Sequence, residues 1–208
     1  MPLRRTDTVA TARAFMAEQG VTELPVLDKS DLYNYVRAIM LIDAKETDKL
    51  EDVLAYNPLA PRAFDNQHLY EIIPVFAASD LQVLAVFNVA NEFVGIIDQR
   101  NIHKKISQSL TYKGIGAVLV ISSRDRDFAP SQIMRLVEEN GAKVLGMMVE
   151  HAENNSLLVS LKLNTTLVKS IVATFLRFDY KVEGCFLAED YNIGAEKEYN
   201  SVLKFFDI

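Results

Sequence analysis

The chain has 208 residues, of which 50% are hydrophobic and 24% charged, and its net charge is −6. These values fit a globular protein of one large domain or two small ones. An acidic chain without a basic stripe argues against nucleic acid as the main partner and disfavours anionic membranes. One cysteine rules out a disulfide within the chain, and no apolar run approaches the roughly 18 residues of a membrane span. The first residues, MPLRRTDTV, lack the apolar core of a signal peptide, so we expect a cytoplasmic protein.

One stretch of sequence occurs twice, as residues 7–36 and 67–97. The copies agree in pattern more than in letters, since Val9, Ala12 and Met16 fall opposite Leu69, Ile72 and Phe76. With one residue inserted in the second copy, Asn34 falls opposite Gly95. A doubled unit predicts a quasi-symmetric pair of half-domains with a cleft between them, and such clefts bind small ligands.

Each copy predicts a helix, a strand, a turn and a second strand, followed by a helical segment. In the first copy the helix ends at Gly20, and in both copies the strands are short apolar runs around a polar turn. The connector 57–66 holds two prolines, and a second break at 111–116 has the composition of a domain linker.

The second half of the chain predicts the order β-α-β-β-α-β, the split arrangement of ferredoxin-like domains. Its first strand, AVLVI at 117–121, is a continuous apolar run typical of a strand buried on both faces. The only cysteine, Cys185, lies in the last apolar strand, where we expect a buried, unreactive thiol. Residues 195–208 carry apolar side chains at helical spacing and predict a terminal helix.

The doubled unit, with LPVLD in one copy and FVGIIDQRNI in the other, resembles a tandem pair of CBS domains, or Bateman module. The third unit resembles an ACT domain through its element order and EENGAKVL. The whole chain is similar to the bacterial acetoin-utilisation accessory proteins. The resemblance implies an α/β (α+β) fold with a CBS pair at 1–112, repeats at about 5–56 and 60–110, an ACT-like domain at 115–190 and a helix at 195–208.

The resemblance also implies a nucleotide site, because CBS pairs bind adenosine-containing ligands at a motif where a strand leads into a helix. This motif consists of a glycine, a Thr or Ser that supplies a hydroxyl group, and an Asp or Asn. In the second copy Gly95 and Asn101 match that motif, whereas Asp98 replaces the hydroxyl and would repel a phosphate at close range. Arg100, His103 and Lys104 lie nearby and can supply positive charge.

In the first copy the motif positions hold Asn34, Arg37 and Met40, and none matches. Arg37 can still hold a phosphate. The candidate ligand residues are therefore Gly95, Asp98, Arg100, Asn101, His103 and Arg37.

ACT domains typically bind amino acids through a glycine in the loop after the first strand. Here that loop is SSRDRDFAPS, without a glycine, which argues against amino-acid binding. The alternating charges at 124–127 fit an ion-paired, solvated loop instead.

No catalytic or metal motif is recognisable: the three histidines stand far apart, and no phosphate loop, nucleophile elbow or dinucleotide fingerprint occurs. We therefore predict a non-catalytic regulatory protein without a cofactor, whose CBS pair binds an adenine nucleotide and whose ACT-like domain mediates dimerisation or transmits the signal. The expected partners are a second copy of the chain, an adenosine-type ligand and a regulated enzyme. The alternatives are a ligand-free dimeric adaptor, with clefts filled by side chains such as Met40 and Phe93, and, more remotely, a small hydrolase.

Overall fold

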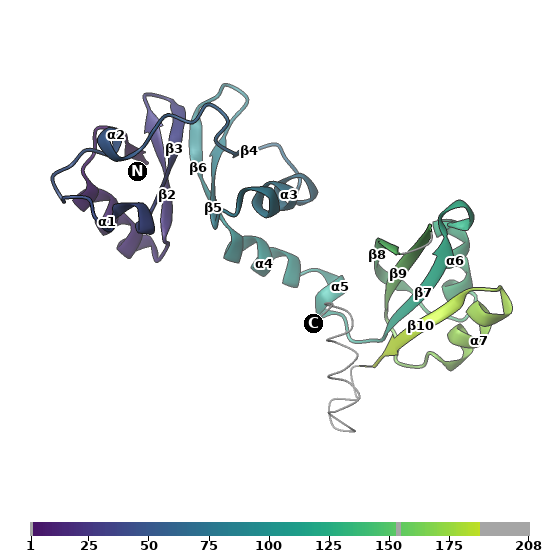
Figure 1. Cartoon of the computed structure of the whole chain (residues 1–208). Helices are drawn as coiled ribbons and strands as arrows, with labels where there is room; N and C mark the ends of the chain where they lie inside the picture. Colours follow the sequence, from purple (N-terminus) through teal and green to yellow (C-terminus); the bar gives the residue numbers. More distant parts are fainter. Residues whose placement is uncertain (1, 153–154, 188–208) are drawn as a thin grey trace. The chain divides into compact units, whose positions relative to one another are not determined.

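The computed structural model describes residues 2–152 and 155–187, and the chain divides into two compact units (Figure 1). The first unit is Met1–Lys105, and the second begins at Ile106. The helix predicted at 195–208 lies outside the described residues. Within the described ranges, no helix is both long enough and apolar enough to cross a membrane.

The first unit contains the two sequence repeats, and each repeat forms a small sheet with helices. The first repeat consists of β1 (Leu3–Arg4), α1 (Val9–Gln19), β2 (Glu23–Asp28), β3 (Asp31–Arg37), the 3-10 helix η1 (Ala38–Leu41) and α2 (Leu50–Val53). The second consists of β4 (Arg62–Phe64), α3 (Leu69–Ser79), β5 (Val83–Phe87), β6 (Phe93–Asp98) and α4 (Gln99–Ser107), whose last two residues already belong to the second unit. In both sheets the first strand runs parallel to the second, and the second and third are antiparallel.

The strand registers confirm the alignment of the two copies, including the inserted residue. Val26 pairs with Asn34 in the first sheet, and Val86 pairs with Gly95 in the second. An irregularity in the ladder follows each of these pairs. The repeated sequence pattern therefore encodes the same local fold twice.

The sequence pattern missed the strand that opens each repeat. β1 and β4 have only two and three residues, and each lies at the edge of its sheet. β4 follows Pro61 inside the tract that we expected to be a connector. Strands this short show no alternation of apolar and polar residues, so the pattern cannot distinguish them from loops.

The two small sheets lie beside each other, and α1 and α3 lie on the outer sides of the pair (Figure 1). Tyr35 of β3 joins the sheets, because its buried hydroxyl donates to the Pro61 carbonyl (2.7 Å) and accepts from the Ala85 N–H (2.9 Å). This contact gives the two repeats a shared buried junction and places β3 opposite the second repeat.

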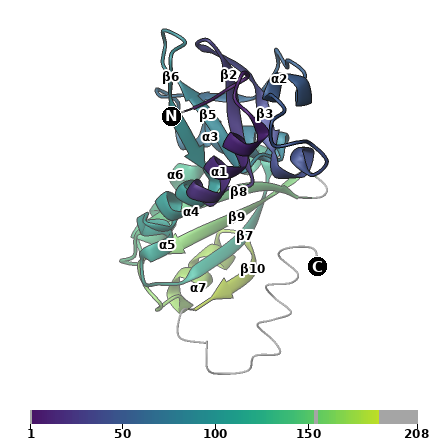
Figure 2. The ribbon, with the colours of Figure 1, turned by 90° about the vertical axis from the view of Figure 1, so that its left-hand side faces the viewer.

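The second unit has the expected element order β-α-β-β-α-β. After α5 (Leu110–Lys113) come β7 (Val118–Arg124), the short 3-10 helix η2 (Asp125–Asp127), α6 (Pro130–Glu138), β8 (Val144–Ala152), β9 (Ser156–Leu163), α7 (Lys169–Arg177) and β10 (Lys181–Phe186). The strands lie side by side in the antiparallel order β10-β7-β9-β8 (Figure 2). Residues 119–121 of β7 are buried, as expected for a central strand.

The helices of the second unit cover one face of its sheet and close the core there. Ile133 and Leu136 of α6 and Phe175 of α7 are fully buried and pack with alternate residues of β7 and β9. Pro130 opens α6, and Gly141, in the left-handed region at φ 74°, follows its end.

The predicted linker at 111–116 is bound to the sheet of the second unit. Thr111 Oγ1 donates to the Leu145 carbonyl of β8 (3.0 Å), and Lys162 Nζ of β9 donates to the Gly116 carbonyl (2.8 Å). The segment therefore folds as part of this unit.

The expectation for Cys185 is wrong, because its side chain is exposed. Among the strands of residues 2–152 and 155–187, β10 lies at the end of the sheet order beside β7, and a bulge between Val182 and Gly184 interrupts their ladder. An apolar run at the edge of a sheet buries less of its surface than the same run at the centre, and the sequence does not say which strand is at the edge.

Candidate ligand-binding site

The predicted motif residues lie where β6 ends and α4 begins. Asp98, the last residue of β6, accepts from the Arg100 backbone N–H at Oδ1 (2.7 Å) and from Arg100 Nε at Oδ2 (2.8 Å). The hydrogen bond and charge of the Arg100 side chain hold the pKa of the Asp98 carboxyl below its usual value. Asp98 and Arg100 thus satisfy each other at the start of α4 rather than leaving two open ligand groups.

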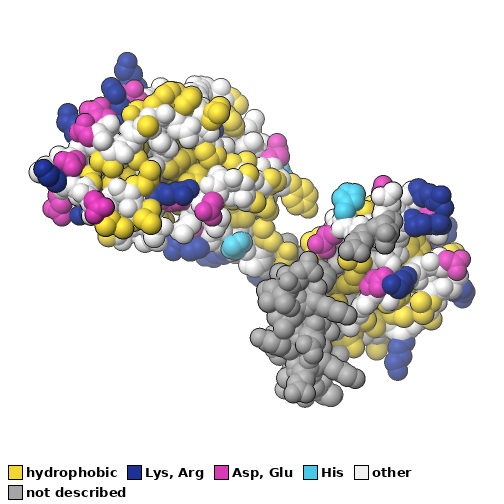
Figure 3. Space-filling model, viewed as in Figure 1, with side chains coloured by type: hydrophobic (Ala, Val, Ile, Leu, Met, Phe, Trp, Pro, Cys, Tyr) yellow, Lys and Arg dark blue, Asp and Glu magenta, His cyan; other side chains and the backbone are white. Residues whose placement is uncertain are grey.

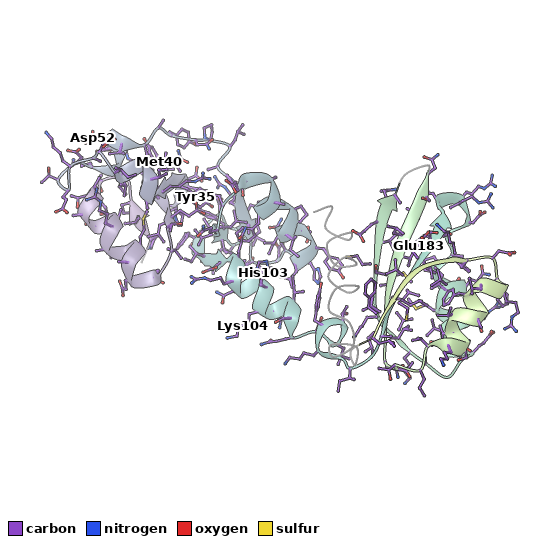
Figure 4. The ribbon with its side chains drawn as sticks, turned by 60° about the horizontal axis from the view of Figure 1, so that its bottom comes forward. Tyr35, Met40, Asp52, His103, Lys104 and Glu183 are labelled. Carbon is purple, nitrogen blue, oxygen red and sulfur yellow. The ribbon has the colours of Figure 1, made fainter. Side chains whose placement is uncertain are left out.

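Asn101 and His103 are exposed on α4, where Figure 4 labels His103. Gly95 lies apart from them, in a cavity of about 240 Å³. Phe15 and Glu18 of α1 and Phe93 of β6 also line this cavity, whereas none of Asp98, Arg100, Asn101 and His103 does. In this cavity Gly95 is therefore separated from the other second-copy candidates.

A larger cavity, of about 770 Å³, lies at the corresponding place in the first repeat. All three motif positions of that copy line it, namely Asn34, Arg37 and Met40. Its other walls come from α3 of the second repeat and from the segment around Leu59. Ligand pockets usually measure about 300–1,000 Å³, so this cavity has the size of a ligand site and the smaller one falls below it.

The difference in size follows from side chains at equivalent positions of α1 and α3. Phe15, Glu18 and Gln19 of α1 line the small cavity, and Val75, Ala78 and Ser79 of α3, each 60 positions later, line the large one. Smaller side chains on α3 leave the larger space. The smaller side chains of α3 are visible when the two repeats are aligned, but the nucleotide motif includes only residues at the step from strand to helix.

The larger cavity has apolar walls with a few polar groups. Ile39, Met40 and Leu59 are exposed beside it, on a unit that carries many hydrophobic side chains at its surface (Figure 3). Both polar ends of the Asn34 amide are engaged, since Nδ2 donates to the Ala55 carbonyl and Oδ1 accepts from the Tyr35 N–H, each at 2.8 Å. Asn57 Oδ1 accepts from the Leu59 N–H at 3.0 Å. These bonds hold the cavity wall in shape.

Arg37 is the charged residue of this cavity, and it also touches the junction of the repeats. Its Nε lies 3.3 Å from Oε2 of Glu23, which is only 4% exposed. The other oxygen of Glu23 accepts from the backbone N–H groups of Gln82 and Val83 (3.2 Å for Val83). A second cavity, of about 520 Å³, lies on the Glu23 side of Arg37. The guanidinium therefore separates the larger cavity from a buried carboxylate.

Tyr35 gives the junction a measurable pH dependence. Burial raises the pKa of its hydroxyl well above the ordinary value near 10. In the unfolded chain this hydroxyl loses its proton near pH 10, while the folded chain retains it. The ionisation of Tyr35 therefore leaves the free energy of unfolding unchanged below about pH 10 and lowers it by up to about 1.4 kcal/mol per pH unit above that pH.

Urea unfolding between pH 9 and pH 11.5 measures this effect, with Tyr35→Phe as the test variant. We expect a shallower alkaline loss of stability in Tyr35→Phe than in the natural chain. At pH 7 the variant should lose about 1–3 kcal/mol, because the buried Ala85 N–H and the half-buried Pro61 carbonyl lose their partner. Tyr33→Phe is the matched control, since the Tyr33 hydroxyl makes one bond, to the Leu54 carbonyl (3.1 Å), in a half-buried position. An unchanged alkaline slope in Tyr35→Phe would contradict the assignment.

The second unit offers a polar cavity of about 410 Å³ beside the loop that follows β7. Arg124 and Asp127 of this loop form an ion pair (2.6 Å), and Arg126 lies 3.7 Å from the same carboxylate. This confirms the prediction of an ion-paired loop at 124–127. Across residues 2–152 and 155–187, no three His, Cys, Asp or Glu side chains are grouped to hold a metal ion.

Comparison with known proteins gives structural neighbours alone. No family model matches the chain, and no curated protein matches it. Solved structures that resemble it include a CBS domain pair/ACT domain protein from Thermotoga maritima, with 13% identity over 51% of this chain and 88% of that one and a TM-score of 0.46. A second neighbour comprises the CBS domains of a transcriptional regulator from Streptococcus pneumoniae, with 15% identity over 50% of this chain and 86% of that one and a TM-score of 0.45.

A third neighbour is CBSX2 in complex with AMP, with 19% identity over 52% of this chain and 87% of that one and a TM-score of 0.44. The neighbours are thus CBS-domain proteins that match about half of the chain. At these identities and TM-scores, the likeness describes a similar course of the backbone and carries no argument about function.

Proposed function

We propose that this chain is a non-catalytic regulatory protein that binds an adenosine-containing nucleotide in the larger cavity, beside Arg37. The observation that carries the proposal is a ligand-sized space with apolar walls and one guanidinium. Apolar side chains such as Ile39, Met40 and Leu59 suit the flat face of a base. An arginine suits a phosphate, because its planar fork of N–H donors matches the phosphate oxygens.

The position of the cavity gives such a ligand a way to act. β3 and η1 of the first repeat form one wall, and α3 of the second repeat forms another. A ligand that fits between them stabilises one arrangement of the two repeats over others, and regulation requires that difference in affinity. We propose that the ACT-like unit mediates dimerisation or passes the ligand state to a regulated enzyme in the cytoplasm.

The proposal moves the expected site from the second cleft to the first. Arg37 is retained as a ligand residue, and Gly95, Asp98, Arg100, Asn101 and His103 become candidates for a weaker, secondary contact at most. The adaptor alternative predicted that Met40 and Phe93 fill the clefts. Phe93 is half-buried beside the small cavity, which fits that alternative there, but Met40 is 46% exposed and leaves the large cavity open.

Calorimetric titration and thermal melting with AMP, ATP, adenosine and S-adenosylmethionine test the proposal. We expect at least one of them to bind and to raise the melting temperature. At a ligand concentration of 100 times Kd, the free energy of unfolding should rise by about 2.7 kcal/mol. If none of the four binds or shifts the melting temperature at millimolar concentration, the nucleotide proposal is wrong and the adaptor alternative takes its place.

A further inference from the structure

Arg37 lines two neighbouring cavities. Among the described residues that line the larger cavity, Arg37 is the charged one. It also lines the neighbouring cavity of about 520 Å³, together with Glu23. Glu23 does not line the larger cavity. A ligand in that cavity therefore meets Arg37 first, and the carboxylate of Glu23 lies behind the guanidinium.

The carboxylate of Glu23 is held in that place. One oxygen accepts from two backbone N–H groups at the start of β5, those of Gln82 and Val83, and the other pairs with Arg37 Nε. The side chain is almost fully buried, so water does not screen it well. Turning Glu23 away from Arg37 would leave backbone donors of the second repeat without a partner, which is costly in a buried place.

The Arg37 guanidinium also contacts backbone carbonyl groups of the second repeat. Its Nη2 lies 3.5 Å from the carbonyl oxygens of Ser79 and Asp80, where α3 ends. These contacts are long and therefore weak. Arg37 is thus positioned by an ion pair with Glu23 on one side and by weak contacts on the side of α3, which also forms the cavity wall.

We propose that Glu23 is the specificity-determining residue of this site, because its fixed negative charge partly neutralises Arg37 and so limits how tightly the cavity holds an anionic ligand. This inference rests on the proposed function. A phosphate beside Arg37 is attracted by the guanidinium and repelled by the carboxylate behind it. A neutral ligand of the same shape is subject to neither force. Glu23 thereby sets the ratio of affinities for AMP and adenosine, while the apolar walls set the affinity that both share.

The variant Glu23→Gln tests this in the full chain. Glutamine has nearly the same shape, and its amide oxygen can still accept from the Gln82 and Val83 N–H groups, but it carries no charge. We expect the Kd of AMP to fall by about tenfold, and the Kd of adenosine to change by less than about twofold. Asp31→Asn is the matched control: Asp31 also pairs with an arginine of the same unit, Arg62 (2.8 Å), but it lines no part of the cavity, so both Kd values should stay unchanged.

The outcomes separate this inference from the proposed function. If AMP and adenosine bind the natural chain but Glu23→Gln leaves AMP affinity unchanged, or weakens both ligands equally, Glu23 only positions the site and the inference is wrong. If neither ligand binds the natural chain, the proposed function itself fails.

Should Glu23→Gln not fold, titration of the natural chain with AMP at different salt concentrations decides the question. A neutralised Arg37 predicts that the Kd of AMP changes by less than about twofold between 50 and 200 mM NaCl. If the affinity for AMP falls steeply over this range, Glu23 does not neutralise the charge of the Arg37 guanidinium, and the inference is wrong.

Discussion

Replacing Ala78 by tryptophan should weaken nucleotide binding, with at least about a tenfold rise in the Kd of AMP, which corresponds to about 1.4 kcal/mol. Ala78 lies on the face of α3 that lines the larger cavity, and the indole would occupy space that the ligand needs. Ala78 is itself exposed, so the substitution does not overfill a packed core. Its effect on the free energy of unfolding should therefore be small.

Ala77→Trp is the matched control for this prediction. Ala77 is also an exposed alanine of α3, but it does not line the cavity, because adjacent residues point about 100° apart on a helix. Val75→Trp, one turn earlier on the cavity side, should reproduce the effect of Ala78→Trp. Equal loss of binding in the Ala77 and Ala78 variants would show that the effect comes from disturbing α3 and not from filling the cavity.

Truncating Phe175 to alanine should cost the second unit about 3–5 kcal/mol of stability. Phe175 is fully buried between α7 and the sheet, and its ring and that of Tyr180 form a T-shaped pair with a centroid distance of 5.4 Å. Removing the ring loses its burial and leaves a cavity that the surrounding core fills only in part. Urea unfolding followed by circular dichroism measures the loss.

Phe178→Ala is the control for Phe175→Ala, because Phe178 is 39% exposed and contacts the Arg177 guanidinium at the surface. We expect this variant to cost less than about 1 kcal/mol. Similar losses in the two variants would mean that the core of the second unit is not centred on Phe175.

The sequence predicted the repeated fold well because each repeat carries its own periodic pattern. The alignment of Asn34 with Gly95 even located the inserted residue, and the paired strands reproduce it. The order of elements in the second unit followed from long apolar strands and two amphipathic helices. What the pattern missed was decided by tertiary context: β1 and β4 are too short to show a period, and the exposure of Cys185 depends on β10 being at the edge of its sheet.

The shape of the candidate cavities could not be predicted from the motif, because a motif describes one strand-to-helix step and a cavity is formed by several elements. The motif favoured Gly95 and Asn101, yet the larger space lies beside Arg37, where α3 carries Ala78 in place of the glutamate found in α1. Glu23 was not singled out at all. Its role depends on contacts with Arg37, 14 residues later, and with Gln82 and Val83, 59 and 60 residues later, and no local pattern records them.

A crystal structure of the full chain grown with saturating AMP tests the central claim most directly. We predict electron density for the nucleotide between β3 and α3, with its phosphate within hydrogen-bonding distance of the Arg37 guanidinium and its base against the apolar wall near Leu59. Nucleotide bound instead beside Gly95, or both cavities empty at full AMP occupancy in solution, would contradict the assignment.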